Sequence, residues 1–309
     1  MAAAALIQDA GAEGAWRVLR PGRVLVDHGP ITMTVEAAQR GCPLTDAALA
    51  GAATAVRLLD ELIPWLAVAR RAVGGSNRRA EAACPEVLCC MMQAVRRLDE
   101  ADFTPMAAVA GAFSELVARS VTNAGADRAI VNNGGDIALY LPPAAGPAQV
   151  GIVSDLGSGA ITHKIEIPAG GSIAGIATSG LGGRSLTKGV ASAVTILART
   201  ASLADAAATA VANATDCDDP AVARCLAEEL DHFTDIRGHR VTKSVGPLSA
   251  PARRAALARG LTRAEQLLGQ GMIAGAVLFV QHETAMLPVG LARPFPARIG
   301  GAGGGRDDG

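Results

Sequence analysis

Aromatic residues and lysines are scarce in this sequence, and neither sign of charge dominates it. Aromatic side chains make up 3% of the 309 residues, and the formal net charge is −1. Of the 28 basic residues, the lysines are only Lys164, Lys188 and Lys243. Without a basic excess the chain offers no electrostatic surface for nucleic acid or for polybasic membrane docking. We therefore expect a small-molecule partner, with no nucleic acid and no membrane.

Signals for export, membrane insertion or metal binding through cysteine are also missing. The N-terminus has neither the positive region nor the apolar stretch of a secretory signal. The most apolar windows, 47–69 and 104–118, contain charged residues, whereas a bilayer span needs roughly 20 mostly apolar residues. We therefore expect a cytoplasmic protein whose cysteines are reduced, partly buried thiols in no metal-ligand spacing. These are Cys42, Cys84, Cys89, Cys90, Cys217 and Cys225.

Hydrophobic residues are abundant, at 50% of the chain, so a large core is expected and disorder is excluded for most of it. Helical periodicity covers 45–72, with Pro64 as a kink or boundary, and 85–99, 104–124, 203–215 and 251–268. Segments typical of strands are 16–36, 128–141, 150–153, 161–167, 172–178, 193–198 and 273–281. Helices gather early and strands gather in the middle, which favours an α+β architecture over regular βαβ winding. We expect 73–81 to be a polar loop.

The first candidate for a binding site is the run Asn132-Asn133-Gly134-Gly135-Asp136. Its two glycines let the backbone turn tightly and approach a ligand, and Asn133 and Asp136 carry groups suited to ribose or amide recognition. The alternative is a plain hairpin turn, for which Asn-Gly is the standard sequence.

The second candidate is the glycine-rich stretch 175–189, which contains Thr178, Ser179, Gly180 and Arg184. Its backbone N–H groups and hydroxyls, together with Arg184 and Lys188, could form a phosphate cradle. The stretch matches no standard nucleotide-binding fingerprint, so a flexible connector with two solvated cations remains the alternative.

The third candidate is the pair Asp205 and Thr209, four residues apart in a predicted helix. Their oxygens share one helical face and could ligate a hard cation such as Mg²⁺. Ser202 and Asp205 also have Ser-x-x-Asp spacing, so Asp205 could instead be a capping carboxylate of that helix. Among the histidines, His28 and His239 follow turn-like patterns beside glycine.

Together, three segments resemble the ApbE superfamily in order and spacing. They are Asn133-Gly134-Gly135-Asp136-Ile137, Ala177-Thr178-Ser179-Gly180 and Ala204-Asp205-Ala206-Ala207-Ala208-Thr209-Ala210. The superfamily comprises FAD:protein FMN transferases and FAD-pyrophosphatase-like flavin proteins. A UPF-type ApbE-like branch of bacteria and archaea is a closer resemblance. Features of that branch are seen in His28-Gly29-Pro30-Ile31, in residues 105–112 and in Gly182-Gly183-Arg184-Ser185.

The resemblance implies an α+β, T-fold-like domain over 16–288, with mixed sheets packed against helices. It leaves 1–15 as a variable segment and 289–309 as a glycine-rich, disordered tail. It also implies FAD and Mg²⁺ as cofactors, with the metal on Asp205 and Thr209. Asn133, Gly134, Gly135 and Asp136 would then contact ribose or base, and Thr178, Ser179, Gly180 and Arg184 would line the phosphates.

The transfer apparatus of the FMN transferases is not found in this sequence. Their histidine base, in a His-Ile-Ile-Asp-Pro-type motif, has no counterpart in 183–189, and alanine replaces a lysine of theirs in 110–115. No catalytic residue is assigned on this basis. Three functions stay open. The first is cleavage or transfer at a flavin pyrophosphate, and the second is a non-catalytic accessory or metabolite-binding role, since archaeal members of the branch are associated with sulfur assimilation. The third is flavoenzyme redox chemistry, which the low aromatic content disfavours because a flavin ring usually stacks on an aromatic side chain. A homodimer is left open as well.

Overall fold

The computed structural model describes residues 14–73 and 83–295. Most of the predicted polar loop at 73–81, the end of the predicted tail and nearly all of the segment 1–15 lie outside these residues. The strands are β1 (Trp16–Arg20), β2 (Arg23–His28), β3 (Ile31–Gln39), β4 (Cys42–Pro43), β5 (Arg128–Asn133), β6 (Asp136–Tyr140), β7 (Ala148–Val153), β8 (Ile161–Ile167), β9 (Gly175–Ser179), β10 (Ala193–Ala198), β11 (Val222–Leu226), β12 (Arg240–Val245), β13 (Ile273–Val280), β14 (Glu283–Leu287) and β15 (Arg293–Pro294).

The helices of the described residues are α-helices, written α, and short 3₁₀ helices, written η. They are α1 (Thr45–Leu62), η2 (Ile63–Trp65), α2 (Leu66–Ala69), α4 (Glu86–Arg96), η4 (Pro105–Ala108), α5 (Val109–Asn123), η5 (Pro143–Ala145), α6 (Ala201–Ala214), α7 (Ala227–Leu230) and α8 (Ala250–Gly269). As expected, the helix that begins at Thr45 stops before Pro64, because proline lacks the N–H that a continuing helix needs.

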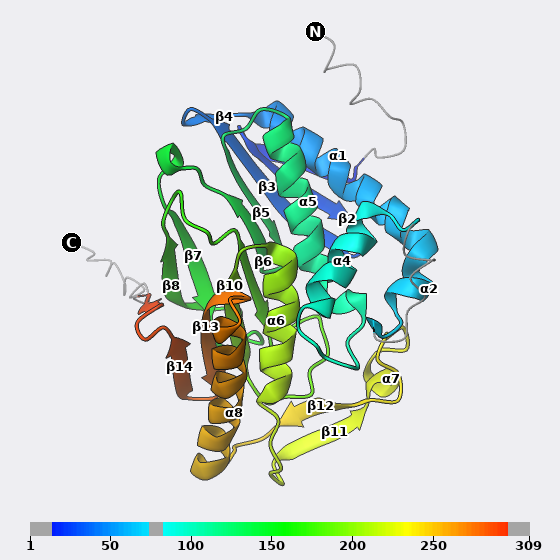
Figure 1. The fold of residues 1–309 in the computed structure, drawn as a ribbon, viewed down its shortest axis with the longest axis vertical. Coiled ribbons are helices and arrows are strands. Elements are labelled where there is room, and N and C mark those ends of the chain that lie inside the picture. Colours follow the sequence, from blue (N-terminus) through cyan, green and yellow to red (C-terminus); the bar gives the residue numbers. More distant parts are fainter. Residues whose placement is uncertain (1–13, 74–82, 296–309) are drawn as a thin grey trace, which may run out of the picture.

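A large sheet organises the described residues, with strands in the order β1-β2-β3-β5-β6-β9-β10-β13-β14 and β4 attached to β3. Neighbouring strands in this sheet are antiparallel. The long helices α1, α5, α6 and α8 cover one face (Figure 1), and a small sheet of β15, β8 and β7 contributes a second layer. The predicted α+β class is therefore confirmed.

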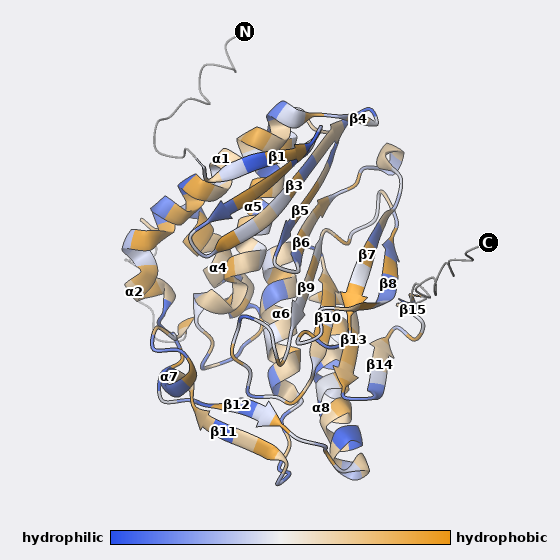
Figure 2. Ribbon diagram, turned by 180° about the vertical axis from the view of Figure 1, so that it is seen from behind, coloured by the Kyte–Doolittle hydropathy of each residue, from blue (hydrophilic) through white to orange (hydrophobic). Residues whose placement is uncertain are grey.

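Two apolar clusters occupy the two faces of the large sheet. Under the helices lies a cluster that includes Met33, Val35, Val131 and Ala138, while Ile137, Ile152, Ile165 and Phe279 pack under the small sheet. Strand β10 is consequently buried at every position, whereas β3 alternates between buried and more exposed residues. Seen from behind (Figure 2), the β1–β3 end shows this alternation of hydrophobic and hydrophilic residues. Both faces of the large sheet are therefore buried only toward its C-terminal strands.

Several short elements were not predicted from the sequence. The two-stranded sheet of β11 and β12 and the hairpin partner β14 carry mostly half-exposed or exposed side chains, so they have little hydrophobic pattern to detect. Residues 289–295, assigned above to the tail, include β15, in which Arg293 and Pro294 pair with Lys164 and His163 of β8. Paired backbone therefore continues beyond residue 288.

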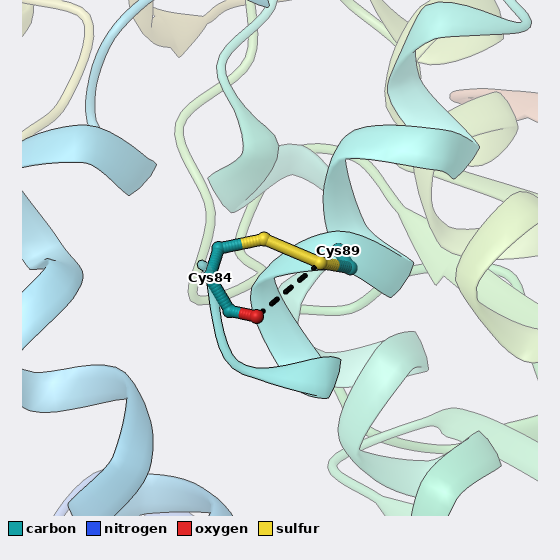
Figure 3. The surroundings of a disulfide bond; sticks show 2 residues. All are labelled: Cys84 and Cys89. Atoms are coloured by element: carbon teal, nitrogen blue, oxygen red, sulfur yellow. Dashed lines mark hydrogen bonds between the residues drawn. A yellow bond between two sulfur atoms is a disulfide. The ribbon is translucent and has the colours of Figure 1, made fainter. Parts of the chain in front are cut away.

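The expectation of six reduced cysteines is wrong for one pair. Cys84 and Cys89 form a disulfide across the start of α4, with their Cα atoms 6.3 Å apart (Figure 3). Cys89 lies in the first turn of that helix, which brings its sulfur back toward Cys84. The remaining cysteines, Cys42, Cys90, Cys217 and Cys225, are free thiols. Composition and spacing gave no signal for this pairing.

Candidate functional site

The run Asn132–Asp136 forms the tight turn between β5 and β6. Gly134 and Gly135 both have positive φ angles, of 67° and 111°, which suits a two-residue hairpin loop. The Asn132 side chain accepts a hydrogen bond from the Gly135 N–H at 2.9 Å and fixes the turn. The hairpin alternative is thus correct, but the same turn also borders a cavity.

That cavity has a volume of about 1120 Å³ and brings the three candidate segments together. Its lining includes every residue predicted for the site: Asn133, Gly134, Gly135, Asp136, Thr178, Ser179, Gly180, Arg184, Asp205 and Thr209. These residues come from β5, β6, β9, the glycine-rich loop and α6, so the fold converges segments that are up to 76 positions apart, from 133 to 209. Its size is at the upper end of the range typical of small-molecule sites.

The cavity is lined by the end of the β5–β6 hairpin and by side chains from both apolar clusters of the large sheet. Leu59, Met106 and Phe113 belong to the helical side, and Ile152 and Ile176 belong to the side of the small sheet. We call these two sets the helical lobe and the small-sheet lobe. We call the polar lining residues of the hairpin tip and of α6 the waist.

Asp205 reaches the waist from the first half of α6, and it does not cap its own helix. The N-cap of α6 is Thr200, whose hydroxyl accepts from the Leu203 N–H. Asp205 instead accepts a hydrogen bond from the backbone N–H of Gly111 at 2.9 Å, and a further one from Ala110. Both donors belong to the first turn of α5, where N–H groups lack helical partners and favour a negative charge. The alternative that Asp205 caps its own helix is therefore wrong, and its carboxylate instead caps the start of α5.

Asp136 lies near Asp205 on the helical side of the sheet. The Ser114 hydroxyl of α5 donates to the Asp136 carbonyl at 2.8 Å, which ties the start of β6 to that helix. Burial raises the pKa of Asp136 to about 7, although the Thr178 N–H and the charge of Arg184 oppose this rise. Burial and the charge of Asp136 raise the pKa of Asp205 well above its usual range. Two desolvated carboxylates thus repel each other across the waist.

Two oxygen atoms at the waist are buried and have no hydrogen-bond partner among the described residues. They are Asp136 Oδ1 and Asn133 Oδ1, the latter on a side chain that is 5% exposed. A buried unpaired acceptor is costly unless a ligand or ion satisfies it. No group of three or more His, Cys, Asp and Glu side chains capable of holding a metal occurs within 14–73 and 83–295. A cation at the waist would therefore need hydroxyl, amide or backbone oxygens besides the two carboxylates.

The two cations of the predicted phosphate cradle have different positions. Arg184 borders the cavity, and its guanidinium donates to the Pro30 carbonyl at 3.2 Å. Lys188 is not part of the lining and forms an ion pair with Asp102. Its inclusion in the cradle is wrong, because the ion pair with Asp102 holds its ammonium group and Lys188 does not line the cavity. The Thr178 hydroxyl forms a hydrogen bond with that of Thr195 at 2.8 Å. The backbone N–H of Thr178 donates to Asp136.

Sequence reasoning missed two contributors to this site. His28, interpreted as a turn residue, lines the cavity at the end of β2. Gly111 allows α5 and α6 to touch, because an added Cβ would lie 2.2 Å from the Ala201 carbonyl oxygen. The only signal for either was their presence in segments that resemble the ApbE-like branch.

Residues 16–286 of the chain match the family model described as "AbpE bacteria". The chain belongs to this ApbE-like family. A UPF0280 protein of Methanothrix thermoacetophila is 42% identical over 116 residues, which are 37% of this chain and 47% of that protein. One of Methanopyrus kandleri is 48% identical over 136 residues, 42% of this chain and 51% of the relative. The chain spans about half the length of these curated relatives.

Among solved structures, this ApbE-like chain is similar to a flavin transferase ApbE from Vibrio cholerae. The match covers 85% of this chain and 95% of the transferase, at 12% identity and a TM-score of 0.44. The flavinyl transferase ApbE of Pseudomonas stutzeri covers 85% of this chain and 90% of its own, at 14% identity and a TM-score of 0.43. None of the helices in the described part is long and apolar enough to cross a membrane.

Proposed function

We propose that this protein binds FAD or a related flavin nucleotide together with Mg²⁺ in this cavity and acts at the pyrophosphate. The observation that carries the proposal is the convergence of the three ApbE-like motifs on one waist with unpaired acceptors. Composition and fold class alone would not single out this ligand, since one fold serves many functions.

The lining of the cavity suits a molecule with two ring systems and a charged centre. Each lobe is walled by aliphatic side chains, such as Leu59 in the helical lobe and Ile176 in the small-sheet lobe. The waist holds the polar groups. A dinucleotide has this distribution, with its pyrophosphate in the middle and a flat ring at either end.

The donor set at the waist fits Mg²⁺, a hard cation that prefers carboxylate and hydroxyl oxygens. Asp205 and Thr209 would hold it, and Asp136 is close enough to repel Asp205. Without a cation these carboxylates would also repel a pyrophosphate, so metal and nucleotide are expected to bind together. When bound, Mg²⁺ neutralises charge that develops as a phosphoanhydride breaks. Arg184 supplies a second positive charge at the edge of the waist.

A non-catalytic accessory or metabolite-binding role is the second candidate, and one observation favours it. Among the histidines, all of which lie in described segments, His28 is the one that lines the cavity. Strand pairing places it on β2, with β3 and β5 between it and Asp136 on β6. A general base must lie within hydrogen-bond reach of the group that it deprotonates, and this strand order separates His28 from the polar residues of the hairpin and α6.

Calorimetric titration with FAD, in Mg²⁺ and then in EDTA, tests the proposal, with assay of the mixture for FMN and AMP. We expect binding that needs Mg²⁺ and that is lost in Asp205→Asn, which keeps an acceptor for the Gly111 N–H but removes the charge. Asp60→Asn, an exposed position on α1 outside the cavity, is the matched control. Release of AMP identifies a pyrophosphatase or transferase, binding without turnover identifies the accessory role, and no binding of FAD contradicts the proposed ligand.

A further inference from the structure

The glycine-rich loop is fixed at both ends, while its tip is exposed. At one end the Leu181 N–H donates to the Ala191 carbonyl at 2.9 Å. At the other, the Thr187 hydroxyl donates to the Asn213 side chain at 3.2 Å, and the Lys188–Asp102 ion pair follows. Residues 182–185 between these anchors are all exposed. We call these residues, whose two ends are fixed, the lid segment.

The side chain of Arg184 ties this lid segment to two turns at one edge of the large sheet. The Arg184 guanidinium donates to the Pro30 carbonyl in the β2–β3 turn and lies directly over Gly134 in the β5–β6 turn. A Cβ added to Gly134 would lie only 2.0 Å from Arg184 Nη2. Within the described residues, the Pro30 oxygen is the one hydrogen-bond acceptor of this guanidinium. Both turns border the cavity, so the arginine bridges them beside it.

We propose that Arg184 is the latch of a lid formed by residues 182–185, seated on Gly134 and Pro30 in the free protein and released when a ligand enters. The seat exists because Gly134 has no side chain. The latch is weak, because the exposed guanidinium bonds one neutral carbonyl and acts on Asp136 only through its charge, with no hydrogen bond to it among the described residues. A phosphate offers the same guanidinium a charged, bidentate partner. The release step rests on the proposed function, whereas the contact of Arg184 with Gly134 and Pro30 in the free protein does not.

Hydrogen exchange of the Gly183 amide in the ligand-free protein tests this contact, because that amide of the lid segment donates to the Gly180 carbonyl at 3.3 Å. We expect Arg184→Ala and Gly134→Ala each to accelerate its exchange about five- to tenfold, the effect of losing one such hydrogen bond. Gly135→Ala is the matched control, because Gly135 also has a positive φ, of 111°, but an added Cβ would meet nothing within 4 Å. The double variant Gly134→Ala/Arg184→Ala should exchange no faster than Arg184→Ala alone.

Unchanged exchange in Arg184→Ala would overturn the proposal, as would equal effects of the two glycine variants. Amides of β5 and β6 report whether the hairpin survives; if it does not, Arg184→Ala and Arg184→Gln decide alone. FAD association followed by flavin fluorescence should show faster entry and faster release in Arg184→Ala. If the native protein fails to bind FAD, the proposed function fails, whereas exchange still decides the latch.

Discussion

The backbone N–H of Gly111 donates to the Asp205 carboxylate at 2.9 Å, so a side chain of α6 closes the first turn of α5. This contact holds the negative charge at the waist against a helix N-terminus, where it is favoured. It also explains why the residue between these two helices is glycine, since an added Cβ at 111 would lie 2.8 Å from the Asp205 Cβ. The geometry of the candidate metal site thus depends on how closely two helices pack.

Gly111→Ala should therefore destabilise the protein by about 2 kcal/mol or more, because the new methyl group overpacks a backbone contact that cannot relax cheaply. Urea unfolding measures the change in free energy. Gly269→Ala, at the exposed end of α8, is the control, since an added Cβ there meets nothing and alanine favours a helix. Equal stability of Gly111→Ala and the native protein would show that the helices are not in contact at this point.

The stability of the metal-free protein should fall as pH rises from about 4 to about 7. The pKa of Asp136 is raised from 3.8 to about 7 in the folded state. Between these values the folded chain holds a proton that the unfolded chain has lost, so raising the pH favours unfolding. Asp102, whose pKa is lowered, loses its contribution only at more acidic pH. Thermal unfolding in EDTA at several pH values measures the slope, and Asp136→Asn should flatten it.

Replacing the other carboxylate should relieve the same repulsion. Because burial and Asp136 raise the pKa of Asp205, the metal-free variant Asp205→Asn should unfold at a higher temperature than the native protein at pH 8. Mg²⁺ should raise the unfolding temperature of the native protein and not that of the variant. Asp60→Asn should behave as the native protein in both conditions. A destabilised Asp205→Asn would mean that its charge serves α5 more than it opposes Asp136.

Reduction of the Cys84–Cys89 disulfide should cost about 2 kcal/mol, the loop-closure value for so short a loop. Cys84→Ser and Cys89→Ser should each lose the same amount, and neither should respond further to reductant. Under non-reducing conditions iodoacetamide should label the exposed Cys42. It should spare Cys90, because burial and the charge of Glu115 raise the pKa of that thiol to about 12. Labelling of Cys84 in the unreduced protein would contradict the disulfide.

The turn glycines and one strand could be predicted from the sequence because each has a local reason for its residue types. Gly134 and Gly135 are required by a two-residue turn, and the strand at 161–167 alternates strongly enough to be located to the residue. The pairing of Asp205 with α5 could not be predicted in this way. Its partner, Gly111, is 94 positions away, and the nearer Ser202 offered a more obvious interpretation.

The rest of the cavity had no local signature. Leu59 and Ile152 read as ordinary core residues, and only the folded chain shows that they face a shared space from opposite sides of the sheet. Lys188 failed for a similar reason: its charge suggested a phosphate contact, but Asp102, far away in the sequence, holds it instead. Long-range partners decide such cases, whereas spacing within a motif does not.

The lining of one cavity by both faces of the large sheet has a consequence for any ligand that is cleaved at the waist. One fragment would remain under the helices and the other under the small sheet, with a strand end between them. The two products would then not compete for one place. Each would leave independently, and the order of their release would be set by the chemistry of the lobe that retains its fragment longer.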